Sequence, residues 1–492
     1  MEGQPKPDGE SEITSTIIFV AGDESQEPLL HNPTPGGDEG EIAPSPSSNE
    51  PDAPSPSPNQ RLLSLDVFRG LTVALMILVD DAGGAFPSIN HSPWFGVTLA
   101  DFVMPFFLFG VGVSISLVFK KISSKRVAMT KVVLRTAKLF LLGLLLQGGY
   151  FHGRNNLTYG VDVLKIRWMG VLQRISIGYL FASIAEIWLV DNVTVDSVTS
   201  FLRKYYVQWI FAVLLCSLNM GLLYGLYVPN WEFEAPSPNL SDYGSSSKIV
   251  NCGVRGSLEP PCNAVGLIDR FFLGEDHLYQ RPLYRRTEQC SVNSPDYGPP
   301  PPNAPGWCSA PFDPEGILSS LMAAVTCFLG LHFGHILVHI KGHMQRVLLW
   351  SLSSFPLLIV GYILELLGIP LCKPLYTLSY TLITAGASGL FLTIIFYVVD
   401  VKNIRRPTLI FQWMGMNALI IYALAACDIF PAALQGFYWH SPRNNLIDGT
   451  ESLLQEMLHS EKWGTLAFVF VEILLWGLFA GFLHMKGIYV KL

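Results

Sequence analysis

The fold of this chain is decided by residues 61–119, RLLSLDVFRGLTVALMILVDDAGGAFPSINHSPWFGVTLADFVMPFFLFGVGVSISLVF. Two apolar runs, 64–84 and 97–119, flank a short loop that carries His91. Each run is long enough to cross a bilayer as a helix, which takes about 20 apolar residues. The stretch therefore predicts two membrane-spanning helices with a histidine in the loop between them.

The composition of the whole chain extends this prediction. Of the 492 residues, 50% are hydrophobic and 14% are charged, whereas soluble domains carry about 25% charged residues. Such a deficit of charge is typical of membrane proteins. A nucleic-acid partner is excluded, because the sequence has no basic patch with interleaved aromatic residues.

Hydropathy predicts an all-α fold, a polytopic membrane helix bundle that fills residues 61–492. About ten transmembrane helices are expected, at 64–84, 97–119, 130–149, 168–190, 205–228, 316–339, 344–368, 375–399, 408–430 and 464–487. Residues 1–60 are different, with twelve acidic residues, one lysine and many prolines and serines. This composition buries too little apolar surface to offset the entropy of ordering, so a disordered cytosolic tail is expected.

The distribution of basic residues predicts the orientation of the bundle. Alternate loops carry the lysines and arginines Lys120, Lys121, Lys125, Arg126, Lys131, Arg203, Lys204, Lys341, Arg346, Lys402, Arg405, Arg406, Lys486 and Lys491. Because basic loops stay in the cytosol, both termini are expected there. The loop of His91 and the long segment 229–315 then face the lumen of an endomembrane, lysosome-like, vacuole-like or other.

Four cysteines in the 229–315 segment support a lumenal location. Cys252, Cys262, Cys290 and Cys308 form an even set within one loop, which predicts two disulfides in an oxidising compartment. The sequence leaves three pairings open. A zinc site would need closer pairs such as C-x2-C, so no metal is expected. The sequons at Asn156 and Asn239 predict a glycoprotein.

The strongest candidate for catalysis is His91, since an imidazole can move a proton near neutral pH. Asp80 and Asp81 end the first span, one loop away. Adjacent positions do not share a helix face, so we expect Asp80 to orient the ring and Asp81 to be solvated.

Other polar residues are weaker candidates for contact with a substrate: Asp66, Arg69, Trp94, Asp101, Arg167, Arg174, Asp276 and His277. For Asp66 and Arg69 a local ion pair is as good an interpretation. Asp101 follows Thr98 as T-x-x-D, which favours a capping box. Arg174 lies deep in its span and is expected to pair with an acid.

These features fit two classes of protein. A multi-pass transporter would use buried His, Asp and Arg as a proton or solute path. A membrane-embedded transferase would take an activated donor from one side and an acceptor from the other. Transporters often show internal repeats, and none is evident here.

Six blocks in order resemble the heparan-alpha-glucosaminide N-acetyltransferase family. They are RLLSLDVFRGLTVALMILVDDAGG, INHSPWFGVTLADFVMPFFLFGVGVSISL, IRWMGVLQRI, VGLIDRFFLGEDHLYQ, FDPEGILSS and LYTLSY. The resemblance implies a transmembrane acyltransferase that uses cytosolic acetyl-CoA and acetylates a lumenal amino sugar, a heparan-type glucosamine. It places the family's active-site histidine at His91. It also implies a shorter homologue that lacks the family's N-terminal lumenal domain, and a homodimer remains open.

Such an enzyme needs cationic side chains for the phosphates of acetyl-CoA at the cytosolic side. The candidates are Lys120, Lys121, Lys125, Arg126, Lys131, Arg135 and Lys138. For any one of them the positive-inside rule alone is a sufficient explanation.

Overall fold

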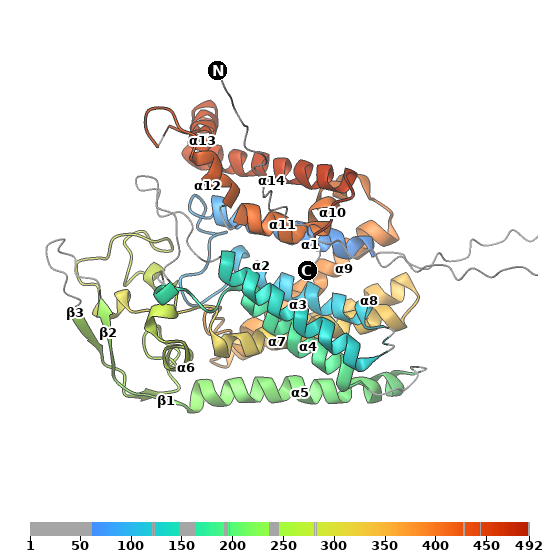
Figure 1. Cartoon of the computed structure of the whole chain (residues 1–492). Helices are drawn as coiled ribbons and strands as arrows, with labels where there is room; N and C mark the ends of the chain where they lie inside the picture. Colours follow the sequence, from blue (N-terminus) through green and yellow to red (C-terminus); the bar gives the residue numbers. More distant parts are fainter. Residues whose placement is uncertain are drawn as a thin grey trace, which may run out of the picture. The chain divides into compact units, whose positions relative to one another are not determined.

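The computed structural model describes residues 62–490, except for 121, 123, 147–162, 191–194, 196, 236–245, 280, 282, 427–428 and 443. The predicted tail at 1–60 and the sequons at Asn156 and Asn239 lie outside the described residues. The described part is a helix bundle with a smaller segment of strands and short helices at one end (Figure 1).

Each of the ten predicted spans coincides with a helix or a helix pair. The helices are α1 (Leu63–Ala82), α2 (Leu99–Val118), α3 (Lys125–Leu146), α4 (Val171–Trp188), α5 (Val198–Gly225), α7 (Ile317–His339), α8 (His343–Leu366), α9 (Leu378–Phe396), the pair α10 (Leu409–Met416) and α11 (Ala418–Ile421), and α14 (Glu461–Met485). Shorter helices are α6 (Ala264–Leu273), α12 (Ile429–Gln435) and α13 (Leu446–Met457). The predicted helical fold is confirmed at this level.

Not all of these helices are both long enough and apolar enough to cross a membrane. Among the described residues 6 helices are, namely α2, α5, α7, α8, α9 and α14. A seventh span results if the α10–α11 pair, bent by 72°, is counted as one. Charged side chains inside α1, α3 and α4, such as Asp66, Lys131 and Arg174, lower the apolarity of these helices.

The centre of the bundle is formed by α2 and α7. In the most apolar stretch of each helix, 67% of the residues of α2 and 83% of those of α7 are buried. The corresponding shares are 17% in α8 and 28% in α5. Glycines permit this close packing: a Cβ on Gly112 of α2 would lie 2.1 Å from the carbonyl oxygen of Cys327, and one on Gly330 of α7 would lie 2.2 Å from that of Phe109. The outer helices α5 and α8 expose leucine and isoleucine side chains, as lipid-facing helices do.

The segment between α5 and α7 is held together by two short antiparallel sheets and two disulfides. Strand β1 (Tyr227–Val228) pairs with β4 (Val254–Arg255), and β2 (Trp231–Ala235) pairs with β3 (Ser246–Val250). Disulfides join Cys252 to Cys262 and Cys290 to Cys308, one of the three pairings that the sequence leaves open.

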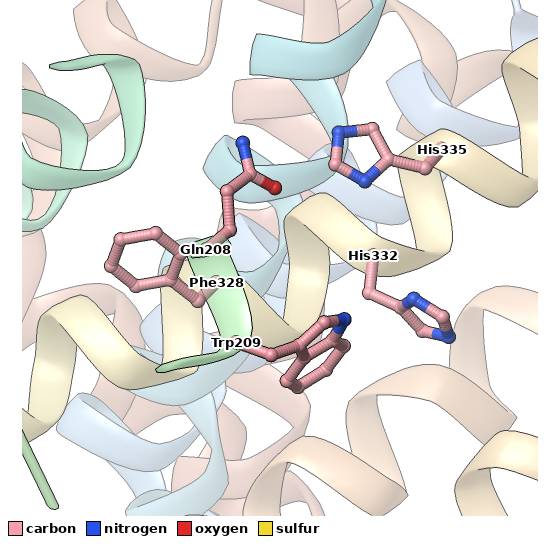
Figure 2. A pocket seen from close by; sticks show the side chains of 5 residues that line it. All are labelled: Gln208, Trp209, Phe328, His332 and His335. Carbon is pink, nitrogen blue, oxygen red and sulfur yellow. The ribbon is translucent and has the colours of Figure 1, made fainter. Parts of the chain in front are cut away.

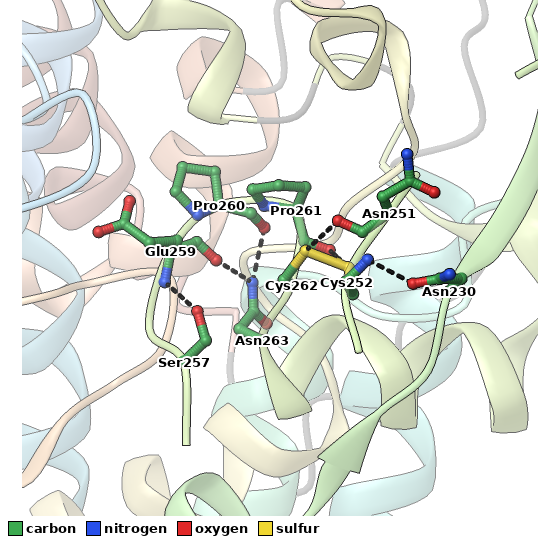
Figure 3. Close-up of a disulfide and its surroundings, with 9 residues drawn as sticks. All are labelled: Asn230, Asn251, Cys252, Ser257, Glu259, Pro260, Pro261, Cys262 and Asn263. Atoms are coloured by element: carbon green, nitrogen blue, oxygen red, sulfur yellow. Dashed lines mark hydrogen bonds between the residues drawn. A yellow bond between two sulfur atoms is a disulfide. The ribbon is translucent and has the colours of Figure 1, made fainter. Parts of the chain in front are cut away.

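Figure 3 shows the first disulfide beside the start of α6. The Asn230 side chain accepts a hydrogen bond from the backbone N–H of Cys252 at 2.7 Å. Asn263 caps α6 by accepting from Gly266 N at 2.8 Å. Asp269 of α6 accepts a hydrogen bond from the N–H of Ile317 at 2.8 Å, which ties the segment to the start of α7.

Candidate functional site

The loop of His91 is held in place by the first turn of α2. The carboxylate of Asp101 accepts hydrogen bonds from the backbone N–H groups of Ser92 and Thr98, each at 3.1 Å. The capping box predicted from Thr98 and Asp101 is present. The Asn90 side chain accepts from the N–H of His91 at 2.8 Å. A charged cap at a helix N-terminus thus also shapes the loop in front of it.

The same carboxylate contacts the imidazole. His91 Nδ1 lies 2.8 Å from Asp101 Oδ1, and Lys373 Nζ lies 2.8 Å from the same Nδ1 and 3.4 Å from Asp101 Oδ1. The Asp101 side chain is fully buried, Lys373 is 9% exposed and His91 is 27% exposed. We call these three residues the His91 cluster. Its imidazole is the member that a reactant can reach.

Asp80 is not the partner of the His91 ring, contrary to our expectation. In the last turn of α1, Val79 and Ala82 are buried, so that Asp80 and Asp81 both point outward and are exposed. Asp101, for which we favoured a capping role, contacts the imidazole instead.

The surroundings of His91 favour a neutral ring. Burial lowers the pKa of His91 below its usual 6.5, the charge of Lys373 lowers it further, and the hydrogen bond and charge of Asp101 raise it in part. Arg286 also lowers this pKa. Because a neutral imidazole is the form that accepts a proton, the cluster keeps His91 competent as a base in mildly acidic conditions.

Lys373 was not among the site residues predicted from the sequence. It lies in the turn 369–377 between α8 and α9, on the side opposite the basic loops. A lysine there departs from the positive-inside rule, and this departure is the signal that could have identified it. The next helix also contributes, since the Tyr380 hydroxyl donates to the backbone carbonyl of Asp101 at 2.6 Å.

Arg167 and Arg174 form a second group nearby, at the start of α4. Arg167 binds the Asp313 carboxylate at 2.6 and 2.8 Å and also the Glu315 carboxylate. Burial opposes the charge of Arg167, but these two acids raise its pKa above the usual range.

Among the described residues Arg174 forms no ion pair, whereas we expected it to pair with an acid. It is 1% exposed, and its Nη2 donates to the carbonyl of Pro314 and to the hydroxyl of Ser319, each at 2.5 Å. Its guanidinium also lies 5.3 Å from the centre of the Tyr376 ring. Tyr376 is three residues after Lys373, so the arginine group adjoins the His91 cluster.

Trp94 and His277 have structural contacts. Trp94 is 3% exposed, and its indole N–H donates to the carbonyl of Leu258 at 2.9 Å, which fixes the loop to the disulfide segment. His277 Nδ1 lies 2.7 Å from the carbonyl oxygen of Ile166 and so holds the chain before α4. Its neighbour Asp276 is exposed.

Two predicted groups lie far from His91. Asp66 and Arg69 pair at 3.3 Å near the start of α1, at the other end of that helix from the His91 loop. The described basic candidates Lys120, Lys125, Arg126, Lys131, Arg135 and Lys138 are exposed around the end of α2 and along α3, and Lys121 lies outside the described residues. The 20 residues of α2 separate His91 from Lys120 by about 30 Å.

A second buried polar cluster lies between α4, α5 and α7. Glu186 binds His335 Nε2 at 2.9 Å and Gln208 Nε2 at 2.8 Å. Gln208 and His335 also line a small cavity together with Trp209, Phe328 and His332 (Figure 2). His335 is 18 residues along α7 from its first residue, so this cluster is separate from His91.

Comparisons with known proteins show what this chain is similar to. Residues 61–225 match the family described as Heparan-alpha-glucosaminide N-acetyltransferase, catalytic. The matched range contains His91 and Asp101, while Lys373 lies beyond it.

Two curated relatives carry the name heparan-alpha-glucosaminide N-acetyltransferase. The mouse protein (Mus musculus) is 28% identical over 431 residues, which cover 83% of this chain and 59% of the relative. The human protein (Homo sapiens) is 29% identical over 433 residues, which cover 83% of this chain and 58% of the relative. The chain thus spans less than two thirds of the length of these relatives. The family resemblance seen in the sequence is confirmed: over most of its length, this chain is similar to the heparan-alpha-glucosaminide N-acetyltransferases.

Proposed function

We propose that this chain is a membrane-embedded N-acetyltransferase. It moves an acetyl group from cytosolic acetyl-CoA to the amine of a lumenal amino sugar, a heparan-type glucosamine. The observation that carries the proposal is the His91 cluster. A partly exposed imidazole is held by a buried carboxylate at one end of the bundle, in the region that matches the family. The names of the two relatives support the type of reaction.

In this reaction His91 serves as the general base. The amine nitrogen forms a bond to the acetyl carbon as the bond from that carbon to sulfur breaks. Nδ1 has one hydrogen at most in the neutral ring, so it either donates to Asp101 or accepts from Lys373. With Nδ1–H on Asp101, Nε2, which Lys373 Nζ approaches to 3.5 Å, takes the proton of the attacking amine and returns it to the leaving thiolate. General-base help of this kind is worth about 10²–10⁴-fold in rate.

A second route uses the same geometry. Nε2 of His91 attacks the thioester first, carries the acetyl group and then passes it to the amine. A burst of acetylated protein before any acceptor is added distinguishes this covalent relay from direct transfer.

The donor and the acceptor reach the site from opposite sides in this proposal. The exposed basic residues around the end of α2 and along α3 bind the phosphates of acetyl-CoA in the cytosol, because the charged nucleotide cannot enter the hydrocarbon. Both termini are cytosolic, all ten helical regions cross the membrane, and the disulfide segment faces the lumen of an endomembrane. Disulfides persist in such an oxidising compartment.

The test is acetyl transfer by the full-length chain reconstituted into sealed vesicles. Acetyl-CoA labelled in the acetyl group is supplied on the side of the basic loops, and glucosamine is enclosed on the other side. We expect labelled N-acetylglucosamine inside the vesicles. If no amine becomes labelled but a solute crosses the membrane, the chain is a transporter and the proposal is wrong.

A further inference from the structure

Arg286 is a buried cation close to the His91 cluster with a free donor group. It ends the short helix η3 (Leu283–Arg286) and is 3% exposed. Its Nε donates to the carbonyl of Pro295 at 2.7 Å, and its guanidinium lies 5.6 Å from the centre of the Tyr297 ring. Its Nη2 is buried and has no hydrogen-bond partner among the described residues.

The position of Arg286 relates it to the site. Tyr284, two residues before Arg286 in η3, packs on Trp94 of the His91 loop with ring centroids 6.1 Å apart. At this position the charge of Arg286 acts on both His91 and Asp101. The segment that carries Arg286 also packs on the loop after α1, since Asp296 Oδ2 lies 3.3 Å from the position of a Cβ on Gly84.

The acids near Arg286 are already engaged. The Asp101 carboxylate binds His91 and the loop N–H groups, and Asp296 Oδ1 accepts from the N–H of Tyr297 at 2.8 Å. No ion pair of Arg286 is found within the part of the chain that the structure describes. A buried guanidinium without an anion is unfavourable, because burial removes water from its charge.

We propose that Arg286 binds an anionic group, a carboxylate or a sulfate, carried by the acceptor, and so selects acidic amino sugars. The inference rests on the proposed function, because it assumes that the acceptor reacts at His91. The planar fork of a guanidinium binds carboxylate and sulfate oxygens through paired N–H groups. The bound anion supplies the partner that Nη2 lacks and holds the sugar amine toward His91.

The test compares two acceptors in the reconstituted full-length protein. One is a disaccharide of glucosamine and glucuronic acid, which carries a carboxylate, and the other is the neutral methyl glycoside of glucosamine. At a pH on the plateau of each protein's own pH profile, where His91 is neutral, Arg286→Gln should raise the KM for the acidic acceptor roughly 10- to 100-fold and leave its kcat and both constants for the neutral acceptor unchanged. Arg286→Lys should restore part of the affinity. Arg285→Gln, a change at the exposed neighbour, is the matched control and should have no effect.

A binding measurement separates this inference from the proposed function. Isothermal titration with the acidic disaccharide should show binding to the wild type and at least 10-fold weaker binding to Arg286→Gln, whether or not acetyl is transferred. If the wild type binds the disaccharide more tightly than Arg286→Gln does but transfers no acetyl group, the anion site stands and the proposed acetyltransferase activity is wrong. The role of Arg286 would be overturned if Arg286→Gln raised the KM for the acidic and the neutral acceptor equally. It would also be overturned if the wild type and Arg286→Gln bound the acidic disaccharide equally well.

Discussion

At the scale of single residues, the site depends on Asp101, which performs two tasks. Its carboxylate caps α2 and shapes the loop, and it also contacts the ring of His91. Asp101→Asn keeps the shape of the side chain but removes the charge. We expect it to slow acetyl transfer about 10²–10⁴-fold, the range of general-base catalysis. The reason is that the uncharged amide no longer favours the tautomer of His91 with the hydrogen on Nδ1, in which Nε2 is the base. Single-turnover rates in vesicles measure this, and a rate within twofold of the wild type would contradict it.

Lys373 is expected to set the pH range of the reaction. Its charge lowers the pKa of His91, in addition to burial and Arg286 and against Asp101. Transfer needs neutral His91, so the rate rises with pH through this pKa, which lies below 6.5 in the wild type. Lys373→Met removes a positive charge and raises the pKa of His91.

The acid limb of kcat/KM for Lys373→Met should therefore move to higher pH. Its measurement between about pH 4 and 8 tests the shift, with Lys165→Met, a change at an exposed lysine, as the control. A limb that stays in place or moves to lower pH would show that Lys373 does not act on the base.

The sequence predicted part of this cluster. His91 was found because the loop is short and lies between two apolar runs. Its partner was misassigned, since nearness in sequence favoured Asp80 while the direction of the last turn of α1 decides against it. Lys373 and Arg286 are 282 and 195 residues away in the chain, and only the packing of α9 and of the disulfide segment brings them to His91.

At the scale of helices, the close packing of α2 on α7 is the contact most sensitive to substitution. A Cβ on Gly112 would lie 2.1 Å from the carbonyl oxygen of Cys327 and 2.7 Å from the N of Leu331. Gly112→Ala must therefore push the helices apart, at a cost of about 1–3 kcal/mol. Gly221→Ala in α5 is the control, since nothing lies within 4 Å of a Cβ there.

Thermal unfolding in detergent measures both variants. Gly112→Ala should unfold at a lower temperature than the wild type, and Gly221→Ala at the same or a higher temperature, because alanine favours a helix over glycine. Equal midpoints for the two variants would refute the close α2–α7 contact.

Hydropathy predicted where the helices are, because a run of apolar residues is a local signal. It did not predict the 72° bend between α10 and α11, because the one glycine there, Gly415, is tolerated inside a helix and does not mark a break by itself. Nor did it show which of the charged helices cross the membrane. The hydrogen bonds of Arg174 and Glu186 come from α5, α7 and the chain before α7, which no window of sequence displays.

At the scale of the whole molecule, the account requires the disulfide segment and the basic loops to lie on opposite sides. In sealed vesicles with the cytosolic side outward, protease should remove the 1–60 tail and leave the 229–315 segment intact. Glycosidase treatment should show a glycan at Asn239, with Asn239→Gln as the control. A protected tail, or cleavage within 229–315, would reverse the orientation.

The role of His91 in acetyl transfer between the two sides of the membrane is tested most directly by His91→Ala in the vesicle assay. Labelled acetyl-CoA is supplied on the cytosolic side with glucosamine in the lumen, and protein amount and acetyl-CoA binding are measured in parallel. The account predicts a loss of at least about 10²-fold in transfer, with binding of acetyl-CoA and expression unchanged. Transfer by His91→Ala at the wild-type rate would contradict it.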